Sequence, residues 1–413
     1  MQDKELYRYL LGLEPPWTVE RVDLNVSDQR VDVWASHEEG LRWPCPECGA
    51  MLPLYDHTAE RVWRHLDSCQ FKTFLHARPP RVDCKKHGVR QVRLPWAEEK
   101  ARFTALFERL AIEVMQACDI LSAAQILRIS WDEAWHIMER AVCRGLKKKR
   151  RRAKRIGVDE KAAGRGHDYV TVVNDLEKAT VEYVSDGRRK ESLDGYFDLL
   201  SEKTRQKIET IAVDIWDPYL ASIRGHVPQW EEKVVFDRYH LTAHMIKAVD
   251  EVRKAENRAL KKVGDETLSG SKYLWLYSKE NLPEKHKSRF HALKGMHLKT
   301  ARAWAIKESF RDLWGYKRLG WAIRHFRAWF FWATHSRLKP VIEKARMFRK
   351  YLMQILTYFR HRVTNAVSEG INSKIETIRK KAYGFRNREH FKTAIYFHCG
   401  GLNLYPVTHR KPG

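Results

Sequence analysis

The spacing of apolar and polar positions changes twice along the chain. Short stretches in which β-branched and aromatic residues recur, separated by Pro-containing turns, predict strands at Arg21–Val26, Arg30–Ala35 and Lys72–Ala77. Between Phe103 and Leu146 the apolar positions recur at helical spacing instead. The first 150 residues are therefore predicted to hold a strand-rich part followed by a helical part.

A third pattern begins after residue 150. Strands are predicted from the apolar runs Arg155–Asp159, Tyr169–Asp175 and Thr180–Ser185, from a run that ends at Asp214, and from Lys233–Asp237. A helix is predicted near Ser192–Gln206, and helices again from about Leu241 to Tyr358 and after it. Strands interleaved with helices favour an α/β sheet, here followed by a long helical segment.

The charge indicates the kind of partner. The 413 residues include 77 Lys and Arg against 52 Asp and Glu, a net charge of +25. Such an excess suits nucleic acid, because each neutralised phosphate releases counterions and adds affinity. There is no apolar run of about 20 residues and no signal-peptide pattern, so no membrane partner is expected. The odd number of cysteines, 7, argues against a disulfide scaffold and favours a reducing, cytoplasmic location.

Four residues near the start have the spacing of zinc ligands. Cys45 and Cys48 form a Cys-x-x-Cys turn, and Cys84 and His87 repeat the spacing, each pair followed by glycine. Two such turns complete a tetrahedral Cys₃His site with no open position, which predicts structural Zn²⁺. Cys69 could replace His87, but its isolation favours a packed thiol.

A helix-turn-helix is predicted next. Asp119–Arg128 reads as a short amphipathic helix, and Ser130 with Glu133 has capping-box spacing for a second helix from Trp131 to about Cys143. The second helix would be offered to a major groove. A basic run follows, which is expected to contact DNA phosphates or to form a solvated linker, and it comprises Lys147, Lys148, Lys149, Arg150, Arg151 and Arg152.

Two acids at strand ends suggest the chemistry. Asp159 and Asp214 each follow an apolar strand, and neighbouring carboxylates repel each other unless a cation lies between them. Hard oxygen ligands suit Mg²⁺ or Mn²⁺, which can activate a water or a 3′ hydroxyl for attack on a phosphodiester. Asp217 is an alternative to Asp214, although Asp217-Pro218 reads as a helix start. Glu369, on a late helix, is the candidate third carboxylate.

Other residues are candidates for the surroundings of these acids. Asp237 and His240 follow a third acid-ended strand, where they could hold a base or a phosphate, or simply cap and pack the next helix. The helix of Glu369 also carries basic residues that suit a phosphate-facing surface, namely Lys374, Arg379 and Lys380.

With these residues laid out, the chain resembles bacterial insertion-sequence transposases of the ISL3 family over nearly its whole length. The motifs that carry the resemblance are Trp63–Asp67, Gly157–Glu160, Val213–Trp216, Phe236–His240, Glu369–Ile375 and Ala382–Asn387. The resemblance implies an RNase H-like catalytic fold with a DDE triad at Asp159, Asp214 and Glu369, a helical insertion before the glutamate, and a role for Asp237 and His240. The chain departs from the pattern where His87 replaces an expected cysteine.

The predicted organisation is α+β and multidomain. It comprises a zinc ribbon (1–100), a helix-turn-helix with its basic linker (101–150), an RNase H-like core in two parts (151–240 and 361–413) and a helical Trp-rich insertion (241–360). The tryptophans of the insertion are expected to be mostly core, with one or two on DNA, and they are Trp275, Trp304, Trp314, Trp321, Trp329 and Trp332.

The function expected from the resemblance is DNA transposition. The enzyme would bind the terminal inverted repeats of its element as double-stranded DNA, cleave with Mg²⁺ or Mn²⁺, and join the 3′ hydroxyl to target DNA. A homodimer on DNA and a nucleoid-associated bacterial location are expected. Two alternatives stay open, namely a non-catalytic DNA-binding regulator and a structure-specific nuclease of the same fold.

Overall fold

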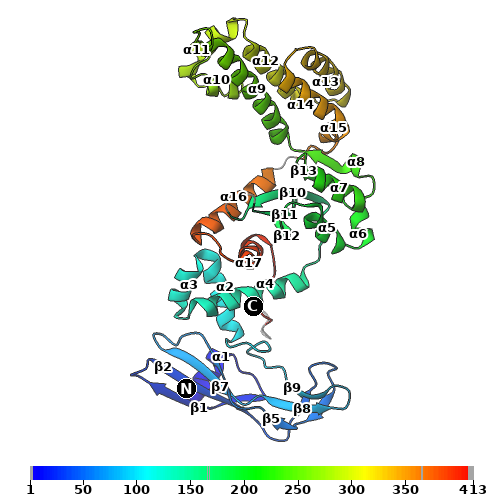
Figure 1. Ribbon diagram of the computed structural model, residues 1–413. Coiled ribbons are helices and arrows are strands. Elements are labelled where there is room, and N and C mark those ends of the chain that lie inside the picture. Colours follow the sequence, from blue (N-terminus) through cyan, green and yellow to red (C-terminus); the bar gives the residue numbers. More distant parts are fainter. Residues whose placement is uncertain (1–2, 165, 167, 364–365, 408–413) are drawn as a thin grey trace. The chain divides into compact units, whose positions relative to one another are not determined.

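A computed structural model describes residues 3–164, 166, 168–363 and 366–407 (Figure 1). The range predicted for the second part of the core includes residues 364, 365 and 408–413, which lie outside the described residues. Contacts group the chain into two compact units, the first formed by Met1–Arg150 with Ile378–Gly413 and the second by Arg151–Thr377. No helix in the described part of the chain is long and apolar enough to cross a membrane.

The first unit contains three small sheets. Its strands are β1 (Trp17–Asn25), β2 (Arg30–His37), β3 (Arg42–Pro44), β4 (Met51–Pro53), β5 (Asp56–His57), β6 (Arg61–Arg64), β7 (Lys72–Ala77), β8 (Pro80–Cys84) and β9 (Gly88–Gln91). They form sheets in the orders β1-β2-β7-β6, β3-β4 and β5-β8-β9. The core beneath them includes Trp17, Trp43, Trp63 and Trp96, whose rings contact one another. Aromatic burial of this size stabilises a part with short strands.

Helices complete the first unit. They are α1 (Asp3–Leu11), α2 (Ala105–Ala117), α3 (Ile120–Leu127), α4 (Trp131–Lys148) and α17 (Arg388–Cys399). The chain reverses between α3 and α4 at Arg128, which has a left-handed φ of 57°. The capping box between Ser130 and Glu133 is present, as predicted. The second helix does not end near Cys143 but continues to Lys148, because its apolar face remains covered as far as Gly145.

The second unit is built on a five-stranded sheet. Its strands are β10 (Arg155–Ala162), β11 (Tyr169–Asp175), β12 (Thr180–Asp186), β13 (Thr210–Val213) and β14 (Val234–Phe236). Their order is β12-β11-β10-β13-β14, with the first three antiparallel and the last two parallel to β10. This order and these directions are those of the RNase H-like fold that the resemblance implied.

Helices surround this sheet and form the insertion. They are α5 (Lys190–Asp198), α6 (Glu202–Gln206), α7 (Asp217–His226), α8 (Trp230–Lys233), α9 (Arg238–Lys261), α10 (Lys272–Leu276), α11 (Glu284–Gly295), α12 (Lys299–Asp312), η1 (Leu313–Gly315), α13 (Leu319–Thr334), α14 (Lys339–Lys350), α15 (Leu352–His361) and α16 (Ala366–Lys381). The single helix predicted at Ser192–Gln206 is two helices, because the chain turns at Leu199–Ser201. The helical segment begins at Arg238, three residues before the predicted start.

Alternation along β10 separates the two faces of the sheet. Ile156 and Val158 are buried in one cluster with residues of α5 and α7. Asp159 and Lys161 point to the opposite face, where they contact α16 through Asn372 and Glu376. Within this unit, α5 and α7 therefore cover one face and the first turns of α16 lie on the other (Figure 1).

Candidate functional site

Asp159 and Asp214 lie at the same level of two neighbouring parallel strands. Gly157 pairs with Ala212 across β10 and β13. Two residues further along each strand direction stand the two aspartates. Asp214 directly follows β13, as predicted, but Asp159 is not at a strand end, because β10 continues to Ala162 in its hairpin with β11. Although β10 continues beyond Asp159, the pairing of Gly157 with Ala212 still places Asp159 and Asp214 side by side on neighbouring strands.

The carboxylates of Asp159 and Asp214 lie in an electrostatically unfavourable environment. Burial, and then the negative charge of Asp214, raise the pKa of Asp159 to about 6. The Oδ1 atom of Asp214 is buried and has no hydrogen-bond partner among the described residues. The neighbouring Glu160 also has a raised pKa, mainly because of burial. These are acids that would gain from a nearby cation.

His240 provides one positive group. Its Nδ1 atom lies 2.9 Å from Oδ2 of Asp214, and this hydrogen bond raises the pKa of His240 to about 9. Asp237 caps α9 by accepting a hydrogen bond from the backbone N–H of Tyr239, while its Oδ2 atom is buried without a described partner. Of the alternatives weighed for this segment, the capping role of Asp237 is present, and His240 contacts Asp214. A role of the two residues in holding a base or a phosphate stays a prediction.

Asp217 is engaged elsewhere. It begins α7, and its Oδ1 atom accepts a hydrogen bond of 2.6 Å from the hydroxyl of Tyr351. The strand-end argument for Asp214 over Asp217 thus agrees with the contacts of both residues.

The helix α16 reaches the site through Asn372. Its Nδ2 atom donates to Oδ2 of Asp159 at 2.6 Å, a contact that the sequence prediction did not include. Glu369, one turn earlier, is exposed and lines a cavity that Asp237 also lines. Asn372 and Glu369 are three residues apart, so they share a helix face. That spacing within the motif is the signal that could have pointed to Asn372.

The described residues contain one group of three or more metal-type ligands that lie within 4.8 Å of one another, and it is Cys45, Cys48, Cys84 and His87. The three carboxylates of the predicted triad are not gathered to that range. Glu369 lies on the same helix as Asn372, which contacts Asp159. Glu369 itself lines the neighbouring cavity, and no described interaction joins it directly to Asp159 or Asp214.

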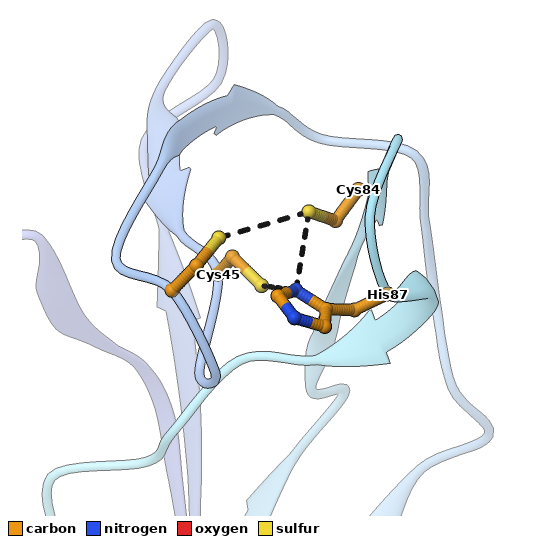
Figure 2. Close-up of side chains that lie close together, drawn as sticks. Cys45, Cys84 and His87 are labelled. Carbon is orange, nitrogen blue, oxygen red and sulfur yellow. Dashed lines mark hydrogen bonds between the residues drawn. The ribbon is translucent and has the colours of Figure 1, made fainter.

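The cysteine and histidine group has zinc geometry. Nδ1 of His87 lies 3.7 Å from Sγ of Cys45 and 3.5 Å from Sγ of Cys84 (Figure 2). The Sγ atoms of Cys48 and Cys84 are 3.8 Å apart. Tetrahedral Zn²⁺ with ordinary bond lengths requires about 3.8 Å between sulfurs and about 3.6 Å between sulfur and nitrogen. Backbone N–H groups of Cys48 and Glu47 lower the pKa of Cys45 to about 6, which favours the thiolate that binds metal. Cys69 is outside the group and is exposed, so the prediction of a packed thiol was wrong.

The two helices of the predicted helix-turn-helix are present as α3 and α4, and they pack against each other. Ala124, Leu127, Ala134, Ile137 and Val142 are buried, whereas Ile120 is only half-buried. A further contact was not predicted, since α17 packs against α4 and the ring of His390 lies 4.1 Å from that of Trp135. The last helix of the chain thus supports the helix-turn-helix.

The basic run is divided between two environments. Lys147 and Lys148 are exposed in the last turn of α4, and Arg150 and Arg152 are exposed after it. Lys149 donates to the carbonyl of Gly400 at 2.9 Å, and Arg151 donates to the carbonyl of Glu182 at 3.4 Å. On α16, Lys374 and Lys380 are exposed and Arg379 is half-buried.

The tryptophans of the insertion are mostly core. Trp275, Trp304 and Trp329 are buried and Trp314 is half-buried. Trp321 and Trp332 are exposed. The expectation of a mainly structural role is confirmed for the buried ones.

Comparisons with known proteins agree along the chain. A family model described as a transposase, of the ISL3 type, matches residues 156–395. The zinc finger of the transposases of IS204, IS1001, IS1096 and IS1165 matches residues 41–87, and the helix-turn-helix domain of transposase family ISL3 matches residues 92–142.

Two curated proteins illustrate the similarity. The transposase for insertion sequence element IS1001 of Bordetella parapertussis is 27% identical over 353 residues, which cover 84% of this chain and 86% of the relative. The transposase for insertion sequence element IS1557 of Mycobacterium tuberculosis is 26% identical over 417 residues, which cover 94% and 93%. No solved structure matches the chain. With a transposase model matching more than half of the chain, preceded by the zinc ribbon and DNA-binding helix-turn-helix of the same family, the protein belongs to the ISL3 family of insertion-sequence transposases.

Proposed function

We propose that this transposase is a DDE enzyme whose Asp159, Asp214 and Glu369 bind Mg²⁺ or Mn²⁺ and direct phosphodiester cleavage and strand transfer. The observation that carries the proposal is the shared level of Asp159 and Asp214 on neighbouring parallel strands. Glu369 joins them because its helix is tied to β10 by the hydrogen bond from Asn372 to Asp159. Acids from two strands and one helix would thus face a common substrate.

The donor set fits divalent cations. Two carboxylate oxygens, Oδ1 of Asp214 and Oδ2 of Asp237, are buried without described hydrogen-bond donors, and leaving them unpaired costs free energy. The pKa of Asp159, raised by burial and by Asp214, would return toward its ordinary range beside a cation. Hard oxygen donors of this kind prefer Mg²⁺ or Mn²⁺. When bound, the ions would supply Lewis acidity to the phosphodiester and lower the pKa of the attacking water or 3′ hydroxyl.

The neighbouring side chains would position the acids. His240 holds Oδ2 of Asp214, whose Oδ1 has no described partner. Asp159 accepts hydrogen bonds at both oxygens, from Asn372 at Oδ2 and from the backbone N–H of Glu160 at Oδ1. Each aspartate therefore has at least one oxygen fixed by the protein. Fixed carboxylates reduce the reorganisation needed to reach the reactive geometry. Water and a DNA 3′ hydroxyl are the nucleophiles, so no covalent protein–DNA intermediate is required.

DNA recognition is assigned to the N-terminal elements. The zinc ribbon and the helix-turn-helix would bind the terminal inverted repeats as double-stranded DNA. The exposed Lys147, Lys148, Arg150 and Arg152 would contact phosphates, as would Lys374 and Lys380. The partly engaged Lys149, Arg151 and Arg379 would add further positive charge for phosphates. Because two ends must be processed together, we propose a homodimer on DNA, acting at the bacterial nucleoid.

The test compares carboxylate variants on a duplex that carries the terminal repeat read from the DNA flanking the gene. Asp159→Asn, Asp214→Asn and Glu369→Gln should keep binding of the duplex but lose Mg²⁺-dependent cleavage. Asp217→Asn is the matched control and should still cleave, because Asp217 contacts Tyr351 and not the pair.

The products separate the proposal from its alternatives. Joined strand-transfer products with target DNA support a transposase mechanism, whereas cut but never joined products would favour a nuclease. Binding without any cleavage by the unaltered protein would favour a non-catalytic regulator. Cleavage that survives in all three acid variants would overturn the triad.

A further inference from the structure

A cavity of about 570 Å³ adjoins the proposed active site within the second unit. Its volume is in the range of sites that enclose a small molecule or one residue of a polymer. The lining residues that matter here are Asp237, Arg238, Tyr239, Lys307, Trp314 and Glu369. One wall is thus the start of α9, another is the end of α12 with η1, and the acids Asp237 and Glu369 are also part of the lining.

Tyr239 offers an uncovered aromatic ring. Its side chain is 68% exposed although it lies only three residues after the end of the buried strand β14. Its backbone N–H serves the cap of α9 by donating to Asp237, so the ring itself has no part in that cap. The ring contacts His240 edge-on, with centroids 5.6 Å apart, and is otherwise open to the cavity side of the helix. An open ring beside a cavity is a surface on which a planar group can stack.

Arg238 offers a positive charge. Its guanidinium lies 4.9 Å from the ring centroid of Tyr358 and has no acidic partner among the described residues. By contrast, the other two cations of the lining are already compensated: Nζ of Lys307 is 3.0 Å from Glu308, and Arg311 is 3.0 Å from both Glu308 and Glu280. Arg238 is therefore the cation of this lining that is free to take a phosphate.

Trp314 adds a donor. Its ring packs on Phe310, Tyr358 and Phe359, and its Nε1 atom is buried without a hydrogen-bond partner in the described part of the chain. An indole N–H that is buried and unpaired costs free energy, which an acceptor on a bound molecule would recover.

The cavity continues along α9. A second hollow of about 310 Å³ shares Tyr239, Thr242, Ile246 and Leu276 with the first. The ring of Tyr239 thus stands where the two hollows meet, and a chain that enters one of them can extend into the other.

We propose that this cavity receives one unpaired nucleotide of the element end, with its base stacked on Tyr239 and its phosphate beside Arg238. The inference rests on the proposed function, because it places the nucleotide next to the acids that would cut the strand. Aromatic stacking, an uncompensated cation and an unsatisfied N–H are the three features that a single nucleotide can satisfy together. Taking a base out of a duplex costs free energy, and stacking of that base on an aromatic ring offsets part of this cost.

The test is a cycle in which the ring and the base are removed separately and together. Binding of the full chain to the terminal-repeat duplex is measured without added divalent cation, so that the DNA stays uncut. Duplexes with a single abasic position are scanned through the end of the repeat. Tyr239→Ala should weaken binding of the intact duplex by roughly 5- to 150-fold, the range that stacking allows. It should cause no loss when the base that occupies the cavity is already missing.

Two variants make the result specific. Tyr239→Phe keeps the ring and should bind like the unaltered chain. Tyr273→Ala removes another tyrosine of the insertion, 65% exposed and outside the cavity, and should also change nothing. An equal loss with Tyr239→Ala on intact and abasic duplexes at every position would overturn the proposal, as would no loss at all. Cleavage of the same duplex after Mg²⁺ is added reports separately on the proposed triad.

Discussion

Replacing Asp159 by asparagine should stabilise the metal-free protein while it removes activity. In the folded protein, burial and the Asp214 charge raise the pKa of Asp159 from 3.8 to about 6. An acid whose pKa is higher in the folded state destabilises that state above the folded pKa, and this penalty disappears below the unfolded pKa. At neutral pH the penalty is therefore complete, and an uncharged side chain of the same shape would avoid it.

The size of the stabilisation expected for Asp159→Asn follows from the pKa of Asp159 and from its hydrogen bonds. A shift of about 2 pKa units corresponds to about 3 kcal/mol at pH 7. The one carbonyl oxygen of asparagine can still accept from Nδ2 of Asn372, but its amide nitrogen would then face the backbone N–H of Glu160 and cannot accept from it, as Asp159 now does at 2.8 Å. That lost hydrogen bond costs about 1 kcal/mol. The net gain is about 2 kcal/mol, which raises the Tm of a unit of this size by roughly 4–8 °C.

Thermal unfolding at pH 7 and pH 5, with zinc retained and no Mg²⁺ added, measures the effect. The advantage of Asp159→Asn should shrink by roughly 1 kcal/mol at pH 5, because the acid of the unaltered protein is then mostly neutral in the folded state. Asp175→Asn is a control from β11, where a buried carboxylate accepts from the backbone N–H groups of Glu177 and Lys178. It should show no comparable gain in stability at pH 7, because both N–H groups donate to the single oxygen Oδ1, an acceptor that asparagine keeps. A variant of Asp159 that is less stable at pH 7, or whose advantage is the same at both pH values, would refute the reasoning.

Two further predictions concern the zinc site and the insertion. Cys45→Ser should lower the bound zinc measured by mass spectrometry to well below one ion per chain, whereas Cys69→Ser should leave it unchanged; full zinc in the first variant would contradict the Cys₃His site. Trp329→Ala should cost about 3–5 kcal/mol in urea unfolding, because the ring is buried and its Nε1 donates to Ile306. Trp321→Ala, at an exposed position, should change stability by less than about 0.5 kcal/mol, and equal losses in the two variants would refute the assignment of core and surface.

The strands of the second unit could be predicted because their signal is local. Tyr169–Asp175 was predicted to the residue, and the strand predicted to end at Asp214 ends one residue earlier, at Val213. The end of β10 was misjudged, since the residues after Asp159 are polar. They remain in the strand because hairpin pairing with β11 continues to Ala162. Pairing of this kind depends on the partner strand and leaves no mark in the periodicity of the strand itself.

The contacts of the site were less predictable than its acids. Asn372 donates to Asp159 across a sequence separation of 213 residues, and α17 packs on α4 from the far end of the chain. Such contacts arise from tertiary packing, which no spacing rule within one segment contains. The pairing of His240 with Asp214 was only partly foreseen: the motif placed His240 near the acids, but not which acid it would bind.

The helical insertion and the proposed active site are structurally inseparable. It leaves the sheet at Asp237, directly after β14, and its last helix α15 packs against β14 and α8 before α16 begins. The cavity between these points is lined by Asp237 and Glu369 together with Lys307 and Trp314 of the insertion. A DNA strand that reaches the acids from this side must therefore contact the insertion as well. The same segment that separates Glu369 from Asp214 in sequence would thus provide walls for the proposed DNA substrate, so the insertion would take part in holding the DNA end.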